Sequence, residues 1–104
     1  MDTLKISKNL TGKDLFLVLL NIYNLGYWEL CISGSLENLL DNEVKPMLYQ
    51  IAKELEVYLD IENPDNIPFD ILKFGIKGIK IKSKDTYLTN YIQNSFPNLR
   101  VINE

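Results

Sequence analysis

Lysine is concentrated in residues 71–84, ILKFGIKGIKIKSK, where five lysines occur without a single acidic residue. Ammonium groups at this density attract phosphates and acidic protein surfaces. We therefore predict partner or phosphate binding by the lysines of this segment, which are Lys73, Lys77, Lys80, Lys82 and Lys84. The last three alternate with isoleucine or serine, so a β-strand would place their side chains on one face.

A second interpretation of this lysine segment is protective. Lysines on a strand at the edge of a sheet discourage its pairing with other chains. No arginine or exposed aromatic residue is expected among these lysines, although nucleic-acid recognition generally uses both. Of the two interpretations, docking and edge protection, the sequence therefore favours edge protection.

Carboxylates are densest in residues 60–70, a turn-rich stretch that contains Asp60, Glu62, Asp65 and Asp70. Such a group could hold Mg²⁺ and, with a nearby lysine, cleave a phosphodiester. A nuclease strand of the (D/E)-x-K form needs one residue between acid and lysine, whereas two residues separate Asp70 from Lys73. We therefore predict a solvated acidic loop and keep a metal-dependent nuclease as a remote alternative.

The chain has no histidine and a single cysteine, Cys31. These two facts remove the usual general base, the Ser-His and Cys-His nucleophile systems, internal disulfides and multi-cysteine zinc sites. No cationic neighbour in the sequence would activate Cys31, which we expect to be a small buried or half-buried residue. We expect no catalytic residue, no cofactor and no enzymatic activity.

Length and composition predict one folded domain. The chain has 104 residues, of which 46% are hydrophobic, and its longest apolar run, residues 15–20, is far too short to span a membrane. We therefore expect a soluble cytoplasmic protein that does not bind membranes. Ten lysines against one arginine are typical of A+T-rich coding, as in low-GC bacteria or viruses of prokaryotes.

Charge is distributed unevenly along the chain. Residues 1–70 contain five lysines and twelve acidic residues, a net charge of −7, whereas residues 71–104 contain six basic and two acidic residues, a net charge of +4. The fold either brings these halves together and neutralises them or keeps them apart as a dipole that docks on a partner.

The clearest helix signal covers residues 12–25. Thr11 and Asp14 have the spacing of a capping box, and Gly26 is placed to end the helix. Apolar residues cover most of the circumference of this helix, which is unusual for a surface helix. It is therefore either the most buried helix or the surface through which two copies associate.

Periodicity predicts the remaining elements. The expected strands cover residues 3–7, 27–33, 57–61, part of the lysine segment and residues 99–101, and the expected helices cover 36–40, 44–55 and 85–95. Ser35 should cap the short helix, Asp41 or Asn42 the next, and Ser83 or Asp85 the last. Trp28 should share a face with Leu30 and Ile32.

In the lysine segment apolar residues change from even to odd positions at Lys77-Gly78, which predicts a hairpin, with a glycine bulge as the alternative. The last helix should turn five residues inward, namely Tyr87, Leu88, Tyr91, Ile92 and Phe96.

Together these elements predict an α/β (α+β-like) domain of two layers, with a mixed sheet and the order β-α-β-α-β-β-α-β. For function we expect a small non-enzymatic protein-interaction module, such as an inhibitor, an adaptor or an immunity-type protein. RNA or DNA binding through the lysine segment is the alternative.

Overall fold

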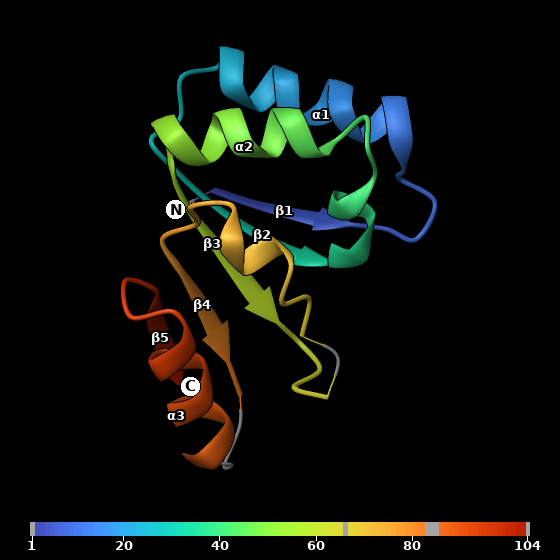
Figure 1. The fold of residues 1–104 in the computed structure, drawn as a ribbon. Helices are drawn as coiled ribbons and strands as arrows, with labels where there is room; N and C mark the ends of the chain where they lie inside the picture. Colours follow the sequence, from blue (N-terminus) through green and yellow to red (C-terminus); the bar gives the residue numbers. More distant parts are fainter. Residues whose placement is uncertain (1, 66, 83–85, 104) are drawn as a thin grey trace.

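The computed structural model describes residues 2–65, 67–82 and 86–103 and contains a five-stranded sheet with three α-helices (Figure 1). The strands are β1 (Asp2–Ile6), β2 (Glu29–Gly34), β3 (Glu56–Ile61), β4 (Gly78–Ile81) and β5 (Arg100–Asn103). The helices are α1 (Gly12–Asn24), α2 (Lys45–Glu54) and α3 (Thr86–Ser95), with short 3₁₀-helices η1 (Leu36–Leu40) and η2 (Ile71–Lys73). This confirms the predicted α/β class and the order of its elements.

The strands lie side by side in the order in which they occur in the chain, and every neighbouring pair is parallel. The expected mixture of parallel and antiparallel strands is therefore replaced by a purely parallel sheet. Each connection must therefore return from the C-terminal end of one strand to the N-terminal end of the next. Right-handed crossovers between sequential strands all lie on the same face of the sheet. The chain consequently advances unit by unit from β1 to β5 (Figure 1).

The predicted hairpin at Lys77-Gly78 is wrong. Residues 71–73 form η2, and the strand begins at Gly78, parallel to β3. Gly75, in the connection between them, has φ +80°, a conformation that favours glycine. The change of apolar parity thus arises because the first half of the lysine segment is a helical turn and a connection, and only the second half is a strand.

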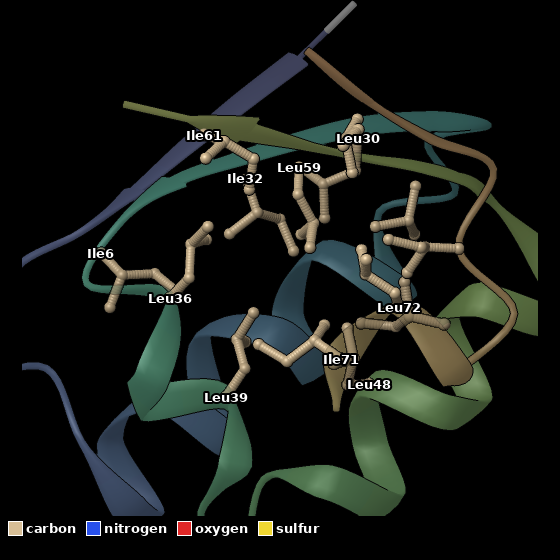
Figure 2. Packing of buried hydrophobic residues seen from close by; sticks show 14 of the residues in the cluster. Ile6, Leu30, Ile32, Leu36, Leu39, Leu48, Leu59, Ile61, Ile71 and Leu72 are labelled. Atoms are coloured by element: carbon tan, nitrogen blue, oxygen red, sulfur yellow. The ribbon is translucent and has the colours of Figure 1, made fainter. Parts of the chain in front are cut away.

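The main core lies between the sheet and its helices. Ile32, Leu59 and Ile79 occupy aligned positions in three adjacent strands and are fully buried. Figure 2 shows Ile32 and Leu59 pointing from the sheet toward Leu39, Leu48 and Ile71 of the helical layer. One face of every strand therefore packs against the helices.

Helix α1 begins and ends close to the predicted positions, with Gly26 just beyond its end at φ +77°. The expected capping box is not formed, because Thr11 makes no side-chain cap hydrogen bond. The helix buries Leu15 and Leu19 but leaves Leu17 and Leu25 exposed. It is therefore not the most buried helix, since α2 buries Met47, Leu48 and Ile51.

The described residues that were predicted to cap η1 and α2 do not form the expected side-chain caps. Ser35 makes no side-chain cap hydrogen bond to η1. Before α2, whose N-cap is Val44, the Asp41 side chain instead accepts a hydrogen bond from the Glu43 N–H at 2.8 Å, and its carbonyl accepts bonds from the Val44 and Lys45 N–H groups. The candidate caps Ser83 and Asp85 of α3 lie outside the described residues.

Helix α3 contacts the core through few side chains. Ile92 is fully buried, and Leu88 and Phe96 are half-buried against the core. Tyr87 and Tyr91, which were expected to face inward, are 79% and 52% exposed. The helix next to α3 on this face is η2, a single short turn, so it cannot cover the flank that carries both tyrosines.

Candidate functional site

The face of the sheet opposite the helices forms an open face in the described part of the chain. Its residues alternate with the core residues along each strand. They are Thr3 and Lys5 of β1, Glu29, Cys31 and Ser33 of β2, Glu56, Tyr58 and Asp60 of β3, Gly78 and Lys80 of β4, and Arg100 and Ile102 of β5. Purely parallel sheets are usually covered on both faces, so this surface is unusual.

The centre of the open face is closely packed. Cys31 and Tyr58 occupy aligned positions on β2 and β3 and are each only 4% exposed, although neither belongs to the main core. A Cβ atom on Gly78 would lie 3.1 Å from Cε1 of Tyr58 and would meet the backbone oxygen of Arg100. Glycine at position 78 therefore lets the tyrosine ring and β5 approach β4 closely, and Cys31 is buried as predicted.

Charges of both signs surround this centre. Glu29 and Glu56 are paired in the register of β2 and β3 and are half-buried. Asp60 and Lys80 are paired in the register of β3 and β4. Like charges on adjacent strands repel, so the Glu29–Glu56 pair is a position at which an incoming cation would lower the energy.

The lysine segment does not form a single row. Lys80 lies on the open face beside Asp60, and Lys82 is exposed just after β4. Lys77 precedes β4 and is exposed, as is Lys73 in η2 on the helical side of the sheet. The remaining candidate, Lys84, lies outside the described residues.

The edge-protection interpretation of these lysines is wrong. Strand β4 pairs with β3 on one side and with β5 on the other, so it lies inside the sheet. The edges of the described sheet are β1 and β5, whose basic residues are Lys5 and Arg100.

The four carboxylates of residues 60–70 are separated by the fold. Asp60 lies on the open face, whereas Glu62, Asp65 and Asp70 are exposed in the connection after β3. Among the described residues no three His, Cys, Asp or Glu side chains are grouped so that they could hold a metal ion. The arrangement agrees with a solvated acidic loop.

The charge asymmetry of the sequence is also an asymmetry in space. Because the strands are in chain order, residues 1–70 build the β1–β3 side of the molecule and residues 71–104 build the β4–β5 side. The strands of the two halves are therefore not interleaved, although residues 71–74 pack against the helical layer of the first half, where Phe74 meets Tyr49 edge to face.

Sequence reasoning missed the exposure of several aromatic residues. Trp28 precedes β2 and is 72% exposed, although its position in the alternating pattern placed it with Leu30 and Ile32. Side-chain burial follows the alternating pattern only from Glu29 onward, where the strand starts. The Leu25-Gly26 turn shortly before it was the available signal that Trp28 lies outside the sheet.

No helix in the described part of the chain combines the length and the apolar composition that a membrane span requires. A scan against family models, a search of curated proteins and a search of solved structures found no match to this chain.

Proposed function

We propose that this protein is a non-enzymatic, cytoplasmic protein-interaction module that binds a folded partner on the open face of its sheet. The observation that carries the proposal is that no helix of the described residues covers the second face of this purely parallel five-stranded sheet. Solenoid repeat proteins built from successive units use such surfaces to bind partners. An inhibitor, an adaptor or an immunity-type protein would use the face in the same way.

The mixture of charges on the open face favours a protein over a polyanion. Glu29, Glu56 and Asp60 lie on the same face as Lys80 and Arg100. A nucleic acid laid across this face would bring phosphates close to three carboxylates. A protein surface can instead place cations opposite the Glu29–Glu56 pair and anions opposite Lys80 and Arg100, which gives orientation and specificity.

The residue types support a role without catalysis. The chain has no histidine, its one thiol is buried, and Asp60 and Lys80 are neighbours on adjacent strands rather than in a (D/E)-x-K strand. Arg100, by contrast, is exposed on this face and belongs to a residue type that is enriched in protein interfaces.

The experiment uses the full chain to capture its partner from native-host extract, followed by binding kinetics with the purified partner. A variant carrying Lys80→Glu and Arg100→Glu reverses the basic side of the open face. We expect at least a tenfold loss of affinity, because like charges would then oppose each other across the interface. Unchanged affinity in this variant would contradict the proposal.

A matched control carries Lys8→Glu and Lys13→Glu, the same change of net charge at two exposed lysines away from the open face. It should bind as the wild type does. Equal losses in both variants would show that only overall charge matters, and nuclease treatment of the extract shows whether the capture needs nucleic acid.

A further inference from the structure

A second surface of the molecule lies on the β4–β5 side, along the flank of α3. The described residues from 71 to 103 carry five positive side chains and no acidic one. These are Lys73, Lys77, Lys80, Lys82 and Arg100. This is the most strongly basic part of the described chain, and helix α3 itself contains no charged residue.

Three exposed aromatic side chains gather on this surface. Tyr87 and Tyr91 are one turn apart on α3 and are 79% and 52% exposed. Phe69, from the connection after β3, is 38% exposed and meets Tyr91 edge to face, with ring centroids 6.1 Å apart. Three aromatic rings are therefore exposed close together on this side of the helical layer.

Lysines lie near both ends of this aromatic group. Lys82 is exposed shortly before the start of α3, at the end that carries Tyr87. Lys73 lines a hollow of about 280 Å³ together with Ser95 and Phe96, at the other end of α3. A helix of this length extends about 15 Å, so a group of three rings with a lysine near each end follows a track of roughly that length.

We propose that this track, defined by Lys82, Tyr87, Tyr91, Phe69 and Lys73, binds single-stranded nucleic acid. Exposed rings stack on bases of any sequence, and lysines beside them neutralise the phosphates. The pairing of the two residue types suits this ligand, because unpaired bases can stack on the rings while the neighbouring phosphates meet the lysines. Duplex DNA does not fit, because α3 has no cation with which to enter a groove and the bases of a duplex are already stacked.

Among the described acidic residues, the one nearest to the track in the chain is Asp70, which is exposed and directly follows Phe69. Its carboxylate repels a phosphate bound next to the phenyl ring. The track therefore predicts a gain of affinity from a substitution as well as losses, because Asp70→Asn removes the repulsion without changing the size of the side chain.

The experiment measures fluorescence anisotropy of labelled single-stranded thymidine and uridine oligonucleotides, at salt concentrations of about 50 and 200 mM. Wild-type protein should bind both, more weakly at high salt. Tyr87→Ala and Tyr91→Ala should each weaken binding roughly five- to tenfold with the salt dependence unchanged. Lys82→Gln should reduce the slope of log affinity against log salt by about 0.7, because the variant neutralises one phosphate fewer. Asp70→Asn should tighten binding.

Matched controls lie on α2, where Tyr49 is 51% exposed and the Lys53 ammonium lies 4.6 Å from the centre of its ring. Tyr49→Ala and Lys53→Gln should leave binding unchanged. No binding at low salt would overturn the proposal, as would equal losses at Tyr49 and Tyr87. Duplex DNA or poly-glutamate binding as tightly as the oligonucleotides would also overturn it, since either result would mean that charge alone acts. The test is independent of the protein partner, because none of these residues lies on the open face.

Discussion

The two ends of the sheet differ in how much of their surface is used for folding. At the β1–β3 end, α1 and α2 together bury five residues, and most central residues of β2 and β3 are buried as well. At the β4–β5 end, Ile92 alone is buried within α3, and β5 has no buried residue. Among the described residues, α3 and β5 therefore contribute fewer buried side chains than α1, α2, β2 and β3, although β4 beside them is itself largely buried. Helix α3 instead exposes Tyr87 and Tyr91.

The largest expected effect is at the well-packed end. Leu19→Ala removes a fully buried side chain from α1 and should lower the free energy of unfolding by about 2–5 kcal/mol. Urea unfolding followed by circular dichroism measures this. A change below about 0.5 kcal/mol, the range usual for surface positions, would mean that α1 contributes no more than an exposed helix and would remove the contrast between the ends.

A smaller effect is expected at the junction of the two ends. In Gly78→Ala the new methyl group would meet the backbone oxygen of Arg100 and approach the Tyr58 ring, so β5 must move. We expect a loss of about 1–3 kcal/mol. Amide exchange should show lost protection in β5 and α3, whereas uniform loss across β1–β3 would contradict the separation of the ends.

At the loosely packed end, Ile92→Val should cost roughly 0.5–1.5 kcal/mol, because one methylene of a fully buried side chain is removed. Faster amide exchange should be confined to α3 and β5, since weakly packed units open locally. Simultaneous acceleration in α1 would show that the two ends unfold as one unit.

The smallest expected effect is at the exposed tyrosine of α3. Tyr87→Ala should change the free energy of unfolding by no more than about 0.5 kcal/mol, because the ring is 79% exposed. Tyr49→Ala on α2 serves as the comparison. A loss above about 1 kcal/mol at Tyr87 alone would mean that this ring contributes to packing and would weaken the case that it is available for binding.

The sequence predicted the strands and helices where one periodicity continues through an element. The alternation of Val57, Leu59 and Ile61 indicated the correct face of β3, and these residues are buried in the core. In the lysine segment the same reasoning failed, because Leu72, Phe74 and Ile76 alternate as strand residues do but belong to η2 and its connection. A 3₁₀ turn followed by an extended stretch is too short to show a helical period.

The site could be predicted only in part. The alternating pattern correctly placed Lys80 on the face of its strand opposite to Ile79 and Ile81. The same pattern carries no information about which strands are neighbours in the sheet. The pairing of Asp60 with Lys80 depends on that strand order. The exposure of Tyr87 and Tyr91 depends on a neighbour, since a longer helix in place of η2 would have covered them. Periodicity identifies a face of a helix but not whether another element is present to cover it.

The order of the strands also bears on how the chain acquires its structure during synthesis. Each strand pairs with the next strand in the chain, and the first paired residues of neighbouring strands are only 20 to 28 positions apart. No strand has to wait for a partner from the far end of the chain, so the entropy lost in closing each loop stays moderate. We expect β1–α1–β2 to provide the template on which later units assemble as they leave the ribosome, with α3 and β5 joining last.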